Sequence, residues 1–316
     1  MTPALRRPAT TRRLGRRAAP LLAAALLGGC GLGAGDPPRD VTLRISEDAG
    51  TRPLRDVPRP AVAGEDTVAR LLQRNAQVET SFSGRFVSAI DGRRGGEDAD
   101  GRRRDWLYFV DGLLADRGAA DVRVQDGDDL WWDRSDTGLA GVTAVVGAFP
   151  APLAGDGAPV LGCAAPAGVA CTRAAARLRA AGAAARPVAL GATAPSGDRG
   201  ARRVIVGPWS ALRRDPVAGL LAQDPRRSGV YAVVTDDGLV PLDARGRTAP
   251  AARRWGLVAA LRPRGGGVTW VVTGATAADA ARAAGALRER ALAGRFAVAL
   301  LGSGRPVGLP RPAGAR

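Results

Sequence analysis

The residue inventory limits the chemistry that this chain can perform. Its 316 residues include no histidine, and all 46 basic residues are arginine. Histidine is the usual general base near neutral pH and a common metal ligand, so Ser-His-Asp triads, Cys-His pairs and histidine metal sites are excluded. We therefore expect no catalytic residues and a protein that is not an enzyme.

One group of carboxylates has the composition of a cation site. Asp126, Asp128 and Asp129 lie close together in the sequence, and Ca²⁺ prefers carboxylate oxygens. The stretch lacks the later glutamate of an EF-hand loop, and Asp126-Gly127 is ordinary turn chemistry. We predict a turn here and no metal site.

The N-terminal segment has the layout of an export signal. Arginines run from Arg6 to Arg17 and are followed by an apolar stretch over 18–29, about 12 residues long, where roughly 20 would be needed to span a bilayer. Leu27-Gly28-Gly29-Cys30 resembles the bacterial lipobox, in which the cysteine is lipidated and becomes the mature N-terminus. We expect a signal peptide over 1–29, lipidation of Cys30 and a glycine- and proline-rich tether over 30–39.

Export changes what the other two cysteines are expected to do. Cys163 and Cys171 are separated by eight positions, with a proline and a glycine between them. In an oxidising compartment this spacing predicts a disulfide that closes a short loop. A metal pair would need further ligands, and none is apparent.

The aromatic residues gather in one stretch. Trp106, Tyr108, Phe109, Trp131 and Trp132 all lie between positions 104 and 133, although aromatics make up only 4% of the chain. Side chains alternate along a strand, so Trp106 and Tyr108 share one face and the neighbouring tryptophans point to opposite faces. Two uses stay open: the rings pack in the core, or some of them form an outward platform for a ligand.

The elements around these aromatics predict an α+β domain over 40–140. We expect strands at 41–46, 85–90, 106–110, 120–124 and 130–133, with Asp-Gly turns between several of them. Residues 52–66 read as proline-interrupted extended chain. Asp66 is expected to cap one short helix that ends near Asn75. The result is a β-grasp-like sheet crossed by a single helix.

A second α/β domain is expected over 150–312, after a link rich in glycine, alanine and proline. Strands are predicted at 159–165, 203–209, 256–262, 269–274 and 295–301, helices at 172–181, 215–223 and 277–292, and a hairpin over 229–246. Residues 146–316 hold 24 arginines against 9 acidic residues, whereas residues 30–145 hold 16 against 21. The arginines are scattered and do not alternate with aromatics, so we expect no nucleic-acid partner.

Four motifs in the first domain resemble a known module. "GEDTVARLL", "FVSAIDG", "WLYFVDG" and "VQDGDDLWW" follow the order of the transcobalamin-like C-terminal domain, a β-grasp-type module of bacterial surface proteins, over about 40–136. The chain as a whole resembles actinobacterial lipoproteins with such a domain. The resemblance implies that the hairpin after the W-x-Y strand presses on a corrinoid. The residues that it assigns to ligand binding are Asp111, Gly112, Leu113 and Leu114, with Trp106 and Tyr108 beside them.

Two departures from that family affect the expected function. The family usually has asparagine where Asp111 stands, and the helical barrel that completes the cobalamin site is missing. We expect a lipoprotein on the outer face of the cell membrane that binds a bulky small molecule, with cobalamin as the leading ligand and no resident cofactor. It would deliver the ligand to a membrane transporter or share it with a second cobalamin-binding protein. The alternative is an envelope interaction or scaffold protein with no small-molecule ligand.

Overall fold

The computed structural model describes residues 35–82, 84, 86–154, 157–192, 200–264 and 266–312. The leader and Cys30 lie outside this range, so the expected signal peptide and lipidation site have no structural counterpart in it. Residues 34–316 form one compact unit of mixed α and β structure. Among the described residues, no helix is both long enough and apolar enough to cross a membrane.

The first sheet is built from four main strands. Strand β1 pairs in parallel with β9, and the remaining pairings are antiparallel. The strand order is β2-β1-β9-β7-β6, with β8 paired to β7. The bounds are β1 Thr42–Glu47, β2 Arg52–Val57, β6 Gly96–Glu97, β7 Arg103–Val110, β8 Leu113–Leu114 and β9 Asp129–Asp136. The segment over 52–57, expected as irregular extended chain, is therefore a paired edge strand.

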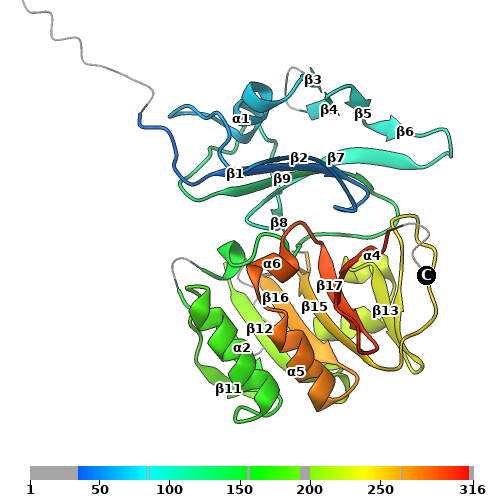
Figure 1. Ribbon diagram of the computed structural model, residues 1–316. Coiled ribbons are helices and arrows are strands. Elements are labelled where there is room, and N and C mark those ends of the chain that lie inside the picture. The colour runs from blue at the N-terminus through cyan, green and yellow to red at the C-terminus, as the bar shows by residue number, and fades with distance from the viewer. Residues whose placement is uncertain are drawn as a thin grey trace, which may run out of the picture. The chain divides into compact units, whose positions relative to one another are not determined.

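One helix and a small second sheet cover one face of the first sheet (Figure 1). Helix α1 spans Val68–Asn75, and the small sheet contains β3 Val78–Ser81, β4 Phe86–Ile90 and β5 Arg93–Arg94. Leu71 and Leu72 of α1 are buried against Leu43 and Ile45 of β1. The single amphipathic helix is as predicted, because its apolar residues recur at helical spacing.

The start of α1 differs from the prediction. Thr67, not Asp66, is the N-cap, and its hydroxyl accepts from the backbone N–H of Arg70. The Asp66 carboxylate is engaged elsewhere, because it accepts from Arg74 Nε at 2.6 Å and from the backbone N–H of Ala63 at 2.8 Å.

The strand predicted over 120–124 is absent. The carbonyls of Ala119 and Val122 accept from the N–H groups of Ala69 and Val68, which have no partner within the first turn of α1. The segment therefore completes the helix N-terminus instead of pairing along its length, although its alternating apolar residues are typical of a strand.

The second sheet has seven strands in the order β11-β10-β12-β16-β15-β17-β18. Strands β11, β10, β12 and β16 are parallel, and β15, β17 and β18 continue the sheet in antiparallel pairs. The α/β character predicted for 150–312 is thus confirmed. The bounds are β10 Val160–Cys163, β11 Pro187–Ala189, β12 Arg202–Pro208, β15 Trp255–Leu261, β16 Val268–Gly274, β17 Ala297–Leu301 and β18 Pro306–Leu309.

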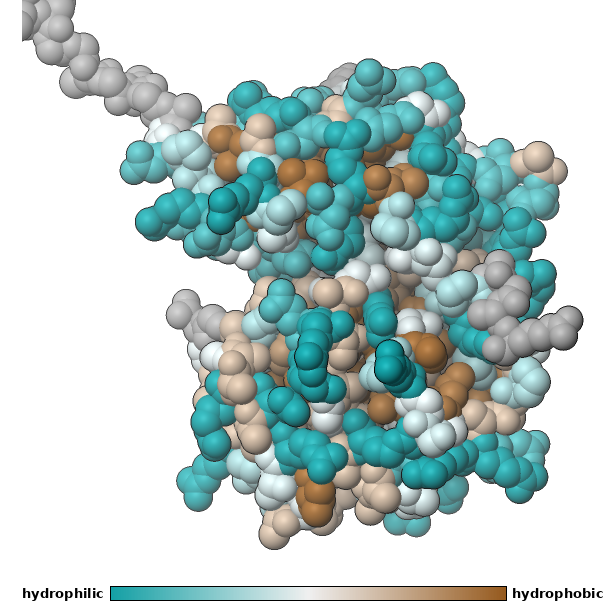
Figure 2. All heavy atoms as spheres, viewed as in Figure 1, coloured by the Kyte–Doolittle hydropathy of each residue, from teal (hydrophilic) through white to brown (hydrophobic). Residues whose placement is uncertain are grey.

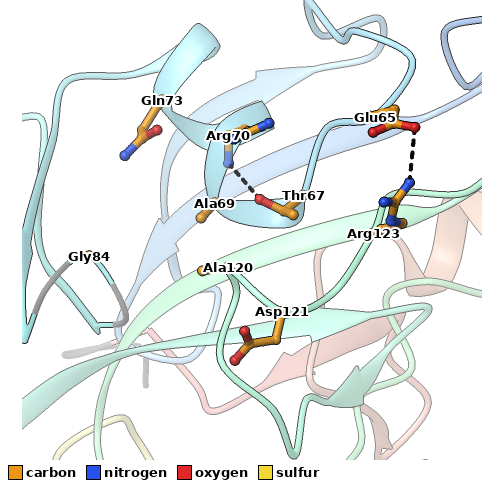
Figure 3. A pocket seen from close by; sticks show the side chains of 9 residues that line it. All are labelled: Glu65, Thr67, Ala69, Arg70, Gln73, Gly84, Ala120, Asp121 and Arg123. Carbon is orange, nitrogen blue, oxygen red and sulfur yellow. Dashed lines mark hydrogen bonds and ion pairs between the residues drawn. The ribbon is translucent and has the colours of Figure 1, made fainter. Parts of the chain in front are cut away.

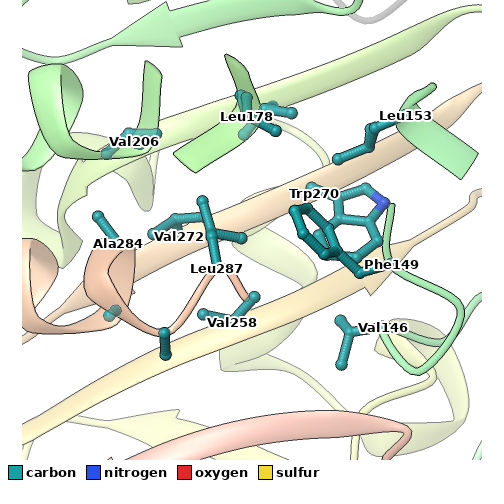
Figure 4. Close-up of a cluster of buried hydrophobic side chains, with 14 of the residues drawn as sticks. Val146, Phe149, Leu153, Leu178, Val206, Val258, Trp270, Val272, Ala284 and Leu287 are labelled. Carbon is teal, nitrogen blue, oxygen red and sulfur yellow. The ribbon is translucent and has the colours of Figure 1, made fainter. Parts of the chain in front are cut away.

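Both faces of this sheet are covered. Helices α2, Val169–Ala180, and α5, Ala277–Gly285, lie side by side on one face (Figure 1). Their alanines pack with Val206, Val272, Trp270 and Phe149 in a core cluster shown in Figure 4. The other face is covered by short elements: α3 Trp209–Leu212, the 3₁₀ helix η3 Ala218–Ala222, α4 Pro225–Ser228 and the hairpin of β13 Ala232–Thr235 with β14 Gly238–Pro241.

Two predicted helices beside the second sheet differ from the structure. The helix expected over 277–292 is divided into α5 and α6, Glu289–Leu292, and the break brings Ala286 and Leu287 into the core. The segment expected as a helix over 215–223 contains only η3. Two further 3₁₀ turns, η1 Ala151–Leu153 and η2 Leu190–Ala192, complete the described elements.

The segment before position 150 is core and not an exposed link. Val145, Val146, Ala148 and Phe149 are buried, and the backbone N–H of Val146 donates to the carbonyl of Phe296. Phe109 and Trp131 of the first sheet share an apolar cluster with strands of the second. One hydrophobic cluster therefore connects the two sheets.

Candidate functional site

The two aromatic residues assigned to ligand binding are part of the core. Trp106 is 4% exposed and Tyr108 is 8% exposed. The polar atom of each ring already has a partner, because Trp106 Nε1 donates to the carbonyl of Arg93 and the Tyr108 hydroxyl donates to the carbonyl of Arg117. Tyr108 also stacks on Trp132 with ring centroids 4.9 Å apart. Beneath α1 these rings offer no free face to a ligand.

The hairpin assigned to the same site is covered as well. The N–H of Leu114 donates to the carbonyl of Thr143, and the N–H of Val145 donates to the carbonyl of Gly112. A Cβ at Gly112 would lie 2.8 Å from the Val145 carbonyl oxygen, so only glycine fits this contact. Leu113 pairs through an isolated bridge with Ala144. The six predicted residues are neighbours in one hairpin, but this hairpin packs against residues 143–148.

Carboxylates surround the base of this hairpin. Asp111 Oδ1 accepts from the backbone N–H of Asp129 at 3.0 Å. Burial raises the pKa of Asp111, and it raises the pKa values of Asp128 and Asp129 to about 6. The described residues contain no group of three or more cysteine, histidine or acidic side chains placed to hold a metal ion.

A pH dependence follows from Asp128. Burial raises its folded-state pKa to about 6 from an ordinary value of 3.8, so the folded chain binds this proton more tightly than the unfolded chain. The contribution of Asp128 to the free energy of unfolding must therefore fall as the pH rises from about 4 to 6. We expect Asp128→Asn to be more stable than wild type at pH 7 and to show a shallower decline of stability between pH 4 and 6, because the contribution of Asp129 remains. Thermal unfolding between pH 4 and 8 measures both.

Asp126 provides the matched control for this pH series. It lies two positions away in the same turn, but its pKa is lowered by hydrogen bonds from Arg39. The contribution of Asp126 to the free energy of unfolding therefore rises with pH instead of falling. Asp126→Asn should not raise stability at pH 7. Equal pH profiles for the two variants would contradict the assignment.

A polar groove lies beside α1. Its volume is about 560 Å³, and Figure 3 shows the side chains of Arg70, Gln73 and Asp121 around it. Glu65 and Arg123 on its rim form an ion pair of 3.5 Å. Its lining has mainly charged, polar and alanine side chains, which is typical of a solvated surface groove.

A second hollow lies at the carboxyl end of the parallel strands in the second sheet. The chain leaves β10 through α2 on one face of the sheet, whereas it leaves the neighbouring β12 through α3 on the opposite face. The connections diverge between these two strands. In open α/β sheets, ligands characteristically bind at such a switch point.

The hollow at this point is an apolar cavity of about 420 Å³. Its walls come from the loop after β10, the end of β12 and the first turns of α2 and α5. Most lining residues are alanine, glycine, valine or proline, and Arg173 is the one charged side chain among them. Val169 lines the cavity and is 63% exposed despite being apolar. We call this hollow the switch-point cavity.

Close backbone approaches set the shape of the switch-point cavity. The Cys163–Cys171 disulfide joins the end of β10 to the first turn of α2 and confirms the predicted pairing. A Cβ at Gly207 would lie 2.6 Å from the Cβ of Ala164, so the ends of β10 and β12 meet only because this residue is glycine. At Gly274, a Cβ would lie 2.7 Å from the backbone nitrogen of Ala280, which seats α5 against β16.

Polar groups at the cavity differ between its two helices. Helix α5 is capped by Thr276, whose hydroxyl accepts from the N–H of Asp279 and donates to the Asp279 carboxylate. Helix α2 begins after Gly168 and has no side-chain cap. The positive end of its dipole therefore adjoins the cavity. Arg173 Nη1 donates to the carbonyl of Ala281 across the two helices.

Sequence reasoning does not find this site because its lining carries no distinctive side chains. A strand-to-helix junction with glycine at "VIVGPW" is a weak signal without the strand order. Only the topology shows that the ends of β10, β12 and β16 meet there.

Comparison with known proteins gives one result, for the region around the first sheet. Residues 65–135 match the family model of a domain of unknown function, DUF4430. No curated protein matches the chain. The match begins just before α1 and ends within β9, so it contains the hairpin and all five clustered aromatics but not the switch-point cavity. The matched residues thus include α1 and most of the strands of the first sheet that follow it.

Proposed function

We propose that this chain is an exported, lipid-anchored binding protein whose ligand is a small, mostly apolar molecule held in the switch-point cavity. The observation that carries the proposal is the position of this cavity at the carboxyl ends of parallel strands whose connections diverge. Small-molecule sites are typically concave, largely apolar and about 300–1,000 Å³ in volume. The cavity of about 420 Å³ lies within that range.

The electrostatics of the cavity favour an amphipathic ligand. An apolar body would contact the alanines and the exposed Val169, while a polar or negatively charged end would be favoured by Arg173 and by the uncapped start of α2. A ligand without any apolar part would make no hydrophobic contacts with most of the cavity lining.

The cellular location is proposed from two features. The leader that ends at Cys30 has the charge, apolar length and lipobox-like end of a lipoprotein signal. The Cys163–Cys171 disulfide suits an oxidising compartment outside the cytoplasm. Together they support a protein tethered to the outer face of the cell membrane.

Corrinoid binding is the second candidate function. The DUF4430 match is consistent with a transcobalamin-like domain, and the hairpin of β7 and β8 corresponds to the expected ligand-contacting loop. In this chain, however, residues 143–148 cover that hairpin. A corrinoid is also larger than the molecules that a cavity of about 420 Å³ encloses. We therefore place the ligand in the second domain.

The proposal is tested by filling the switch-point cavity from its rim. Ala278 lies in the first turn of α5, lines the cavity and is exposed, so Ala278→Phe can occupy the space without displacing core residues. The full chain should bind the apolar anionic dye 8-anilinonaphthalene-1-sulfonate, detected by its fluorescence. We expect Ala278→Phe to weaken this binding by about tenfold or more, the equivalent of about 1.4 kcal/mol.

The matched control is Ala176→Phe, which adds the same ring to an exposed position of α2 outside the cavity. It should bind the dye as wild type does. Equal binding by all three proteins would overturn the proposed site. A parallel titration with cobalamin separates the two functions, since corrinoid binding that persists in Ala278→Phe would favour the second candidate.

A further inference from the structure

A basic hollow lies on the face of the second sheet that carries α2 and α5. Its volume is about 300 Å³, and four arginines line it: Arg173 and Arg177 from α2, Arg282 from α5, and Arg288 from the connection between α5 and α6. Figure 2 shows hydrophilic side chains over this face. Gly285 lies beneath the side chain of Arg173 at the crossing of the two helices.

The positive charge of this hollow is poorly balanced. Arg282 pairs with Asp279 at 3.0 Å, but Arg254 shares the same carboxylate at 3.5 Å. In the part of the chain that the structure describes, neither Arg177 nor Arg288 forms an ion pair with an acidic side chain. Arginines elsewhere in this domain are better matched, as the buried Arg203–Asp215 pair shows.

Two nitrogen atoms of the arginines that line the hollow lack a hydrogen-bond acceptor. Arg288 Nε and Arg282 Nη2 are buried, and neither has a partner among the described residues. A buried charged donor without an acceptor is costly. Burial lowers the pKa of Arg288, and the neighbouring charges of Arg290 and Arg177 lower it further. The four arginines thus concentrate positive charge around one hollow.

We propose that this hollow binds a phosphate-type oxyanion. Several guanidinium groups that converge on an open surface match the oxygen atoms of a phosphoryl group, because each planar fork can donate two parallel hydrogen bonds. Such an anion would pair with the guanidinium groups of Arg177 and Arg288, which have no acidic partner among the described residues, and would neutralise the repulsion between them. The inference is independent of the proposed apolar ligand, because the switch-point cavity is a separate hollow, although Arg173 borders both. Only the phospholipid source discussed next rests on the proposed membrane tether.

The phosphoryl group has two sources with the same chemistry. One is a free phosphate ion, and the other is the headgroup of an anionic phospholipid, which a membrane-tethered protein would meet at high local concentration. The experiment therefore has two arms at constant ionic strength: calorimetric titration of the full chain with inorganic phosphate, and co-sedimentation with vesicles of phosphatidylglycerol or of phosphatidylcholine alone.

The test variant is the double substitution Arg177→Ala with Arg288→Ala, and the control is Arg179→Ala. Arg179 lies on the same helix, is exposed and does not line the hollow. We expect the double variant to lose about tenfold or more in affinity, since a hydrogen bond to a charged group is worth that factor. The control should stay within about twofold of wild type, because a single exposed charge acts weakly.

Each outcome is decisive. Titratable phosphate binding that the double variant loses supports a free-phosphate site. Selective capture by phosphatidylglycerol vesicles, lost in the double variant and unaffected by inorganic phosphate, supports a headgroup site. Phosphate should also raise the unfolding temperature of wild type but not of the double variant. Absence of binding in both arms, or equal losses in Arg179→Ala, would overturn the proposal.

Discussion

Replacing Trp131 with alanine should lower the free energy of unfolding by about 3–5 kcal/mol, the range for removing a large buried aromatic side chain. Trp131 is 1% exposed and packs edge-on against Phe296 with ring centroids 5.1 Å apart. Its ring lies so close to Gly50 and Gly147 that a Cβ at either position would clash with it. Little can move into the space that the ring leaves.

Equilibrium denaturation followed by circular dichroism measures this loss. Trp131→Phe keeps most of the apolar area but loses the hydrogen bond from Nε1 to Ser46 Oγ, so it should cost about 1 kcal/mol beyond the change in area. Trp209→Ala is the control, because Trp209 is only half-buried at the rim of the second sheet. A loss at Trp131 no greater than at Trp209 would contradict the central packing role.

Trp131 also shows what the sequence can and cannot predict about the aromatic cluster. Alternation along a strand predicts that Trp131 and Trp132 face opposite sides, and this is confirmed: Trp132 lies beneath α1 and Trp131 lies against the strands of the second sheet. The pattern cannot reveal whether an outward face stays free, because that depends on distant residues such as Phe296. The interpretation of these aromatics as an outward platform for a ligand is wrong, because both faces of the sheet are covered.

Helices and strands are predicted well from the sequence where their own residues determine them, and poorly where distant contacts do. Continuous apolar runs such as "VIVG" and "WVVTG" predict β12 and β16, because a central parallel strand is buried on both faces. Strands β3 and β11 are short, and pairing with a neighbour defines them more than their own residues do. The absent strand over 120–124 has the right alternation, but its carbonyls serve the start of α1.

The candidate sites were hidden from sequence reasoning for a similar reason. Alanines and glycines such as Ala164 and Gly207 carry no chemical signature, and they form a cavity only after the sheet order brings their strand ends together. The arginines of the basic hollow are indistinguishable in sequence from the other arginines of this half. Their shortage of acidic partners becomes visible only when α2 and α5 pack side by side.

Asp133→Ala should destabilise the fold by about 3–5 kcal/mol, because several buried donors lose their acceptor together. Asp133 is fully buried in β9. One carboxylate oxygen accepts from the N–H of Ala49 and the Ser135 hydroxyl, and the other accepts from the N–H of Gly50 and the Ser46 hydroxyl. These contacts fix the tight turn between β1 and β2, where Ala49 has a positive φ of 56°.

Asp133→Asn separates hydrogen bonding from side-chain volume at this position. The amide has one oxygen, so its NH₂ group must face the N–H of either Ala49 or Gly50, and we expect a loss of about 1–3 kcal/mol. Asp56→Ala is the control on the same sheet, because Asp56 forms only a long, exposed ion pair with Arg44 and should cost less than about 1 kcal/mol. Urea denaturation at pH 7 gives all three values. A variant Asp133→Asn as stable as wild type would show that the carboxylate does not hold the turn through both of its oxygens. Burial raises the pKa of Asp133, so the negative charge would then be a net cost to the stability of the fold.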